Sequence, residues 1–230
     1  MLKKSFFALL ALAIVISISF VFASPQEGEE SFSKLMSGNK RFVTASLAQK
    51  DVGEARRKEL AGGQHPFAIV VTCSDSRVAP EILFDEGLGE IFVVRVAGNV
   101  LDPISLGSIE YAAEHLHAPL LVLMGHEQCG AVSAALDAKG EPEGNIGAIL
   151  KKIMPAVKKA KAKGGSRDDM LNNAIRENVA LSYKDIRGKS PVLKHLIDKG
   201  ELKVMAGVYH LASGEVESLP LEAPAAHHAH

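Results

Sequence analysis

The stretch VVTCSDSRVAP, residues 70–80, decides the fold. It contains the end of an apolar, β-branched run over residues 67–72, which predicts a short strand buried on both faces, as in parallel sheets. Cys73 follows the run directly, and Asp75 and Arg77 come after it on alternate positions. The chain has only two cysteines, so one of them stands where a buried strand ends, beside a carboxylate and a guanidinium.

Strands and helices alternate on both sides of this stretch. Pro80 can open a helix, and a second apolar run, IFVVRV, predicts a strand over 91–96. Asp102 and Pro103 are an N-cap and first-turn signal, and apolar residues with helical spacing follow them. PLLVLM predicts a third strand over 119–124. This alternation indicates an α/β fold, with a mainly parallel β-sheet flanked by helices.

The rest of the chain divides into segments around this domain. Residues 24–64 are polar with a few apolar anchors and predict an N-terminal helical arm. The α/β domain is expected over 65–220, and it ends in a predicted strand, turn and strand over 201–219. Residues 221–230 predict a disordered tail with three histidines, His227, His228 and His230.

Residues 1–23 have the pattern of a signal peptide. Two lysines precede the uncharged apolar run 6–22, and Ala23 provides a small residue at the cleavage position. We expect cleavage before Ser24, export to the periplasm and no stable membrane association afterwards. The alternative is an uncleaved anchor, because this uncharged run of 17 residues is just long enough to span a bilayer.

Charge excludes one broad class of function. The 230 residues include 26 Lys and Arg and 27 Asp and Glu, so the formal net charge is −1. A general nucleic-acid binder is typically basic, and we therefore expect no nucleic-acid partner. The balance favours a small or neutral substrate.

The second cysteine lies in an equivalent position after the third predicted strand. The motif GHEQCG presents His126 and Cys129 three residues apart. If the first strand lies between the other two, the strand order reverses there, and ligands bind at such a point beyond the strand ends. Cys73, His126 and Cys129 then converge as a three-ligand zinc site with a fourth position open. We expect Gly125 and Gly130 to let the backbone turn tightly around the metal.

Simpler interpretations compete with the zinc site. Either cysteine can be a small buried hydrophobic residue, and in an exported protein the two can form a disulfide. A disulfide gives no role to His126 or to the neighbouring charges. Asp75 and Arg77 can form an ordinary salt bridge or, beside a metal, a bidentate pair that controls the carboxylate.

The motifs CSDSRV and GHEQCGA, about fifty residues apart, resemble those of a β-class carbonic anhydrase. The segments FSKLMSGNKRFV, FVVRVAGNV, GSIEYAAEHL and GVYHLASGEV are also similar to that family, so the resemblance extends over about 31–216. It implies that Cys73, His126 and Cys129 bind one zinc ion per chain. It also implies that Asp75 and Arg77 form a catalytic pair.

The resemblance implies further site residues and an assembly. Gln64 matches a glutamine that hydrogen-bonds substrate in the plant-type branch, and Phe92 and Tyr111 match two aromatic residues of the substrate pocket. The chain has no tryptophan, which argues against the bicarbonate site of the other branch. The family forms dimers with the active site near the interface, so we expect a homodimer or tetramer.

The expected function is reversible hydration of CO2 to bicarbonate and a proton, by attack of a zinc-bound hydroxide. The alternatives are hydrolysis of CS2 or COS on the same fold, and a non-catalytic zinc and thiol redox sensor. Asp75 can also reach the metal as a fourth ligand in a closed form. Because Arg77 can hold Asp75, we expect the open form at neutral and alkaline pH.

Overall fold

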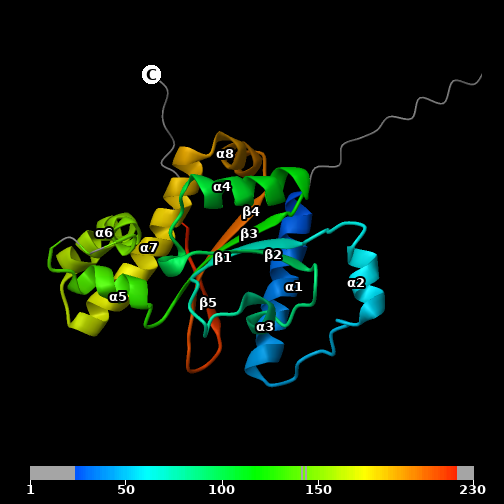
Figure 1. The fold of residues 1–230 in the computed structure, drawn as a ribbon, viewed down its shortest axis with the longest axis horizontal. Coiled ribbons are helices and arrows are strands. Elements are labelled where there is room, and N and C mark those ends of the chain that lie inside the picture. The colour runs from blue at the N-terminus through cyan, green and yellow to red at the C-terminus, as the bar shows by residue number, and fades with distance from the viewer. Residues whose placement is uncertain (1–23, 141, 143, 222–230) are drawn as a thin grey trace, which may run out of the picture.

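The structure is a computed structural model that describes residues 24–140, 142 and 144–221. The predicted signal peptide and all but the first residue of the predicted tail lie outside these residues. One five-stranded sheet forms the centre, in the order β2-β1-β3-β4-β5 (Figure 1). Its strands are β1 (Ala68–Thr72), β2 (Ile91–Arg95), β3 (Leu120–His126), β4 (Lys203–Tyr209) and β5 (Val216–Leu219).

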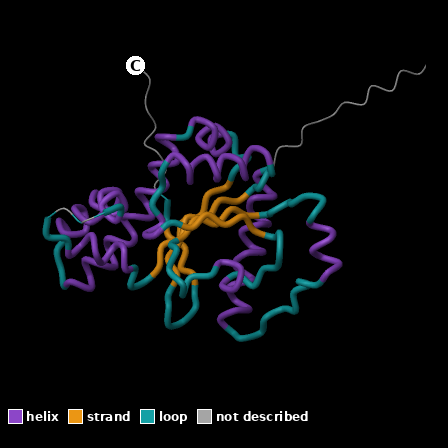
Figure 2. Tube along the Cα trace, viewed as in Figure 1, coloured by secondary structure: helices purple, strands orange, loops and turns teal. Residues whose placement is uncertain are grey.

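Helices surround the sheet and connect its strands, as the trace in Figure 2 shows. Before and between the first strands lie α1 (Pro25–Val43), α2 (Glu54–Leu60), α3 (Pro80–Leu83), η1 (Ala97–Asn99), α4 (Pro103–Glu110) and η2 (Tyr111–His115). After β3 lie α5 (Gly130–Asp137), α6 (Ile146–Lys163), α7 (Arg167–Lys189) and α8 (Pro191–Asp198). None of the helices in the described part of the chain is long and apolar enough to cross a membrane.

The pairing of the strands confirms the predicted α/β class. β1 is parallel to both β2 and β3, β3 is parallel to β4, and only β5 is antiparallel. β1 therefore lies between β2 and β3, and the strand order reverses beside it. This is the arrangement in which the residues after β1 and the residues after β3 meet at one edge of the sheet.

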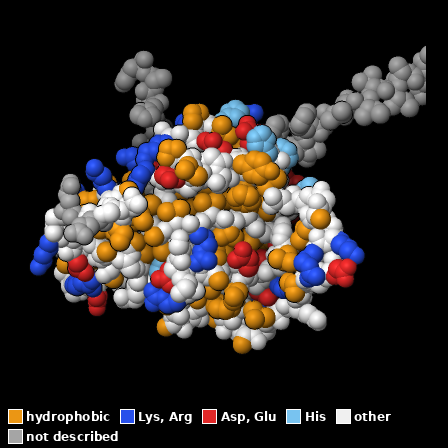
Figure 3. Space-filling view, viewed as in Figure 1, with side chains coloured by type: hydrophobic (Ala, Val, Ile, Leu, Met, Phe, Trp, Pro, Cys, Tyr) orange, Lys and Arg blue, Asp and Glu red, His pale blue; other side chains and the backbone are white. Residues whose placement is uncertain are grey.

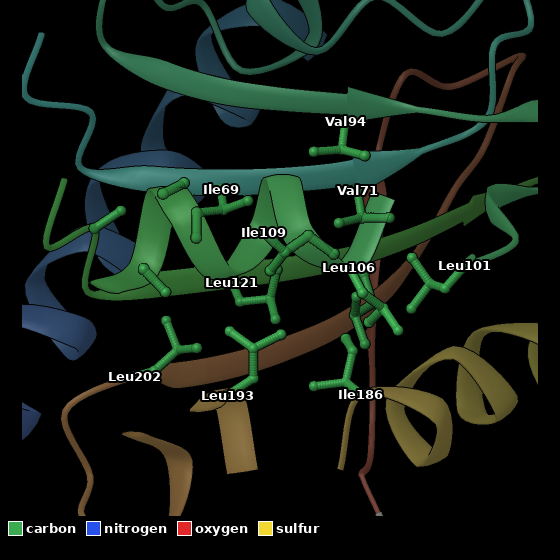
Figure 4. Close-up of a cluster of buried hydrophobic side chains, with 14 of the residues drawn as sticks. Ile69, Val71, Val94, Leu101, Leu106, Ile109, Leu121, Ile186, Leu193 and Leu202 are labelled. Atoms are coloured by element: carbon green, nitrogen blue, oxygen red, sulfur yellow. The ribbon is translucent and has the colours of Figure 1, made fainter. Parts of the chain in front are cut away.

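Hydrophobic residues from the sheet and from helices on its two faces form the core. On one face, side chains of the strands pack against α4, α7 and α8 (Figure 4). The residues labelled in this view are Ile69, Val71, Val94, Leu101, Leu106, Ile109, Leu121, Ile186, Leu193 and Leu202. On the other face, Leu35 of α1 and Leu83 of α3 pack against β1, β3 and β4.

The N-terminal helix α1 packs closely on the rest of the chain. Leu35 is fully buried, and a Cβ added at Gly38 would lie 1.8 Å from the carbonyl oxygen of Phe84. Asn39 donates to the carbonyl oxygens of Leu83 (3.0 Å) and Gly214 (2.9 Å). The predicted arm is thus helical, and its first helix shares the core of the α/β sheet.

The predicted helix start at Pro80 and the predicted N-cap Asp102 are confirmed, because α3 begins at Pro80 and Asp102 precedes α4 directly. Asp102 caps α4 and Ser166 caps α7, each in a reciprocal capping box. The predicted third strand is too short, because β3 continues to His126, where it pairs with Tyr209 of β4. The last part of the predicted helix after Asp102 is the π-helical turn η2.

Candidate metal centre

Cys73, His126 and Cys129 converge at the carboxyl edge of the sheet. Cys73 follows β1, His126 is the last residue of β3, and Cys129 is the N-cap of α5. Their exposed fractions are 4%, 0% and 1%. One ligand atom from each lies within 4.8 Å of the other two. The predicted convergence of these three side chains is confirmed.

The imidazole of His126 is oriented for a metal. Its Nδ1 lies 2.8 Å from the carbonyl oxygen of Glu127, so Nδ1 carries the proton and donates to that oxygen. Nε2 then has a free lone pair, yet it is buried and has no hydrogen-bond partner. Buried polar atoms are normally satisfied, and a ligating histidine typically donates its other ring N–H to a carbonyl. A metal ion fits the unpartnered Nε2.

The two thiols also fit a metal. Their sulfur atoms are 4.0 Å apart and both cysteines are free. Two Zn–S bonds of about 2.3 Å in tetrahedral geometry would separate the sulfurs by roughly 3.8 Å. A hydrogen bond from the Cys129 thiol lowers the pKa of Cys73, and the same interaction, with burial, raises the pKa of Cys129. The pair thus shares a proton where a cation would bind both sulfurs.

The backbone at the site differs from the expectation for its glycines. Neither Gly125 nor Gly130 has a positive φ, whereas Gln128 has a φ of 52°. Gly125 is needed for close packing, because a Cβ there would lie 2.9 Å from Cγ2 of Val179. The prediction that the two glycines form the tight turn was wrong, since the left-handed residue of that turn is Gln128.

Asp75 and Arg77 form the expected bidentate pair. Nε of Arg77 donates to Oδ1 of Asp75 at 2.9 Å, and the second guanidinium bond, to Oδ2, is 2.8 Å long. The Arg77 guanidinium holds the pKa of the Asp75 carboxyl well below its usual range. Oδ2 lies 3.9 Å from Nε2 of His126, so the carboxylate is beside the triad while Arg77 holds it.

Arg95 is a site residue that the sequence interpretation missed. It ends β2 opposite Thr72, and its guanidinium donates to the carbonyl oxygens of Cys73 (3.2 Å) and Asp75 (2.7 Å). These bonds hold the backbone that carries one thiol and the carboxylate. A single charge within the apolar run FVVRV was the available signal, but its partners depend on the register of β1 and β2.

Three residues implied by the family resemblance lie elsewhere in this single chain. Gln64 is exposed in the segment before β1. Phe92 pairs in register with Ile69, four residues before Cys73, which corresponds to roughly 13 Å along a strand. Tyr111 is 48% exposed, and its ring centroid is 6.4 Å from that of Phe92. Their roles in a substrate pocket stay predictions.

Comparison with known proteins places the chain in a family. The Carbonic anhydrase family matches residues 68–216, which include the whole triad. The chain is 40% identical over 191 residues to a carbonic anhydrase of Mycolicibacterium smegmatis, covering 81% of this chain and 91% of the relative. It is 39% identical to carbonic anhydrase 2 of Mycobacterium tuberculosis, over 80% of this chain and 89% of the relative.

Solved structures agree with this assignment. A β-carbonic anhydrase of the fungal pathogen Aspergillus fumigatus superposes with a TM-score of 0.67 at 30% identity, covering 84% of this chain and 92% of that chain. A β-carbonic anhydrase of Coccomyxa, solved with acetazolamide, gives a TM-score of 0.66 at 26% identity, over 84% of this chain and 83% of that chain. With its Cys-His-Cys triad at the edge of a parallel sheet, the chain belongs to the carbonic anhydrase family, in its β class.

Proposed function

We propose that this chain catalyses the reversible hydration of CO2 to bicarbonate and a proton, with one zinc ion per chain as cofactor. The observation that carries the proposal is the unpartnered Nε2 of His126, buried beside the sulfurs of Cys73 and Cys129. Two thiols and an imidazole are a ligand set that zinc prefers, and catalytic zinc sites keep a fourth position open. Bound zinc acts as a Lewis acid that makes water a nucleophile near neutral pH.

The chain's own residues orient the reactants. Asp75 presents a carboxylate that can accept a hydrogen bond from the nucleophile and so direct its lone pair toward CO2. Arg77 holds both oxygens of that carboxylate, which keeps it from becoming a fourth ligand. Arg95 holds the backbone of the same segment. The pairing of Asp75 with Arg77 supports the open form as the working state.

A second copy of the chain would complete the substrate pocket. β2 is an edge strand, and the ring pair of Phe92 and Tyr111 lies on it and on the adjacent η2, far from the triad of its own chain. Hydrophobic side chains gather across the middle of the face shown in Figure 3. We therefore propose a homodimer, or a tetramer built from it, in which these aromatic residues face the partner's site. Gln64 would hydrogen-bond a substrate oxygen there.

We also propose that the protein is exported. The basis is the sequence pattern of residues 1–23, a charged start, an apolar run and a small residue at the cleavage position. Cleavage would leave Ser24, which caps α1, as the first residue. N-terminal sequencing of protein recovered from the periplasm tests this, and a membrane-retained chain that still begins at Met1 would contradict it.

The proposed activity is tested by stopped-flow CO2 hydration together with zinc analysis of the purified protein. Wild type should hold one zinc per chain, and Cys73→Ser, His126→Ala and Cys129→Ser should each lose both zinc and activity. Asp75→Asn is the matched control at the same site, because it should keep zinc and lose most turnover. Full zinc occupancy in Cys73→Ser would refute the ligand assignment, and a zinc-loaded wild type without activity would refute the reaction.

A further inference from the structure

The turn η1 brings a backbone amide to one of the metal-ligating sulfurs. The N–H of Gly98 donates to Sγ of Cys73, with an N···S distance of 3.2 Å. Gly98 and Asn99 both have left-handed backbone conformations, with φ of 67° and 45°. A side chain at the first position would also crowd α6, because a Cβ there would lie 2.7 Å from Cδ1 of Ile153, which would have to shift. The turn needs support at Asn99, since a left-handed conformation is strained for a residue other than glycine.

Asn178 of α7 supplies that support from the other side of the turn. It is 2% exposed, and its Nδ2 donates to the carbonyl oxygen of Gly98 at 2.7 Å and to Oδ1 of Asn99 at 3.4 Å. Asn178 therefore holds Gly98 at its carbonyl while the amide of the same residue faces the sulfur of Cys73. Its hydrogen bonds go to Gly98, Asn99 and Ser182, so Asn178 acts on the triad through the turn.

Ser182, one helical turn further along α7, holds a different part of the same turn. Its hydroxyl can donate its one proton to the carbonyl oxygen of Asn99 (3.2 Å) or of Asn178 (3.1 Å), and it accepts from Nδ2 of Asn99 at 3.3 Å. Ser182 thus binds the second residue of the turn only. Both side chains contact Asn99, but only Asn178 bonds the carbonyl oxygen of Gly98.

We propose that Asn178 is a positioning residue of the metal centre, which keeps the Gly98 amide on the sulfur of Cys73. A hydrogen bond to a thiolate is charge-assisted and lowers the energy of the sulfur lone pair. The sulfur then donates less electron density to a bound metal, which stays a stronger Lewis acid. Residues that orient ligands in this way change metal affinity or activity by about 10–100-fold when they are removed. The inference rests on the proposed zinc function and assigns that tuning to α7.

The test uses full chain loaded with Co(II) in place of zinc, because thiolate-to-Co(II) charge transfer reports the energy of the sulfur lone pair. In Asn178→Ala the near-ultraviolet band should move to lower energy than in wild type. Exchange of the Gly98 amide, followed by NMR, should be roughly fivefold faster, as expected for loss of one hydrogen bond. Asn178→Asp, which has nearly the same size, replaces the alanine variant if that variant does not fold.

Ser182→Ala is the matched control, since it removes a buried bond to the same turn and leaves the bond from Asn178 to Gly98. Its charge-transfer band should match that of wild type. An unchanged band in the folded Asn178 variants would overturn the inference, and so would an equal shift in Ser182→Ala. Failure of the proposed zinc site is distinct, because wild type loaded with Co(II) would then show no thiolate band at all, and failure of the proposed reaction would appear only as missing CO2 hydration by wild type.

Discussion

The same substitution at two helical glycines should change stability in opposite directions. In Gly38→Ala the new Cβ would lie 1.8 Å from the carbonyl oxygen of Phe84, whereas real Cβ atoms essentially never come within 3.0 Å of such an atom. The helix α1 must therefore retreat from α3 by about 1.2 Å, the difference between these distances. Gly107 of α4 has nothing within 4 Å of the added Cβ and is exposed.

The retreat of α1 has an estimable cost. Asn39, next to Gly38, makes three buried bonds, two as donor and one as acceptor from the N–H of Val216 at 3.0 Å. Weakening bonds worth about 1 kcal/mol each adds to an overpacking strain of about 1–3 kcal/mol. Alanine favours the helix over glycine by about 1 kcal/mol, which offsets part of this loss of stability. We expect Gly38→Ala to lower the free energy of unfolding by about 2–4 kcal/mol.

Urea denaturation of zinc-loaded protein, followed by circular dichroism at one protein concentration, measures both variants. Gly107→Ala should raise the free energy of unfolding by up to about 1 kcal/mol, because nothing opposes the gain in helix preference. For a chain of this size the loss in Gly38→Ala corresponds to a fall in Tm of roughly 6–12 °C. If the free energies of unfolding of the two variants agree within about 0.5 kcal/mol, α1 does not pack closely on α3 in the folded protein.

Further predictions concern charge, catalysis and the metal. Burial opposes a charge on His210, but hydrogen bonds to Glu127 and Glu217 outweigh it and raise the pKa of His210. Protonated His210 therefore stabilises the folded state fully below the unfolded pKa of about 6.5. This stabilisation is lost as the pH rises through the pKa that His210 has in the folded protein. His210→Gln should destabilise zinc-loaded protein more at pH 6 than at pH 9 in urea denaturation, and an equal loss at both would contradict the sign. Arg77→Ala should lower kcat about 100-fold because Asp75 is no longer positioned. Stopped-flow assays measure this, and a crystal structure with Asp75 still held away from the metal would contradict the cause. Removing zinc with a chelator should lower the free energy of unfolding by about 2.7 kcal/mol relative to zinc at 100 times Kd, which calorimetry of both forms checks.

The triad could be predicted because it depends on local patterns and one topological rule. The apolar run before Cys73 predicts a buried strand, and the spacing of His126 and Cys129 needs only the end of the next parallel strand. The rule that the carboxyl ends of parallel strands share one edge then brings both segments together. The chain has only two cysteines, so their positions near strand ends, with His126 beside one of them, indicate the site even when the full packing is unknown.

Other parts of the site depend on contacts that no local pattern encodes. Arg95 reaches the backbone of Cys73 because β1 and β2 pair in one particular register. Asn178 is 80 residues from Gly98 in the sequence, and only the path of α7 across η1 brings them together. Gln128 takes a left-handed conformation beside two glycines that do not, since the chain must place Cys129 at the start of α5. Long-range register and packing decide each of these positions.

The separation of the ligands along the chain sets the order in which the protein can acquire its metal. His126 and Cys129 are three residues apart and can meet in a short peptide, but Cys73 joins them only across a crossover that contains α3, β2 and α4. A growing polypeptide therefore lacks a complete chelating set until β1 and β3 have paired. The metal can therefore bind tightly only after the sheet has assembled. Until then, both thiols can react with oxidants or bind competing ions.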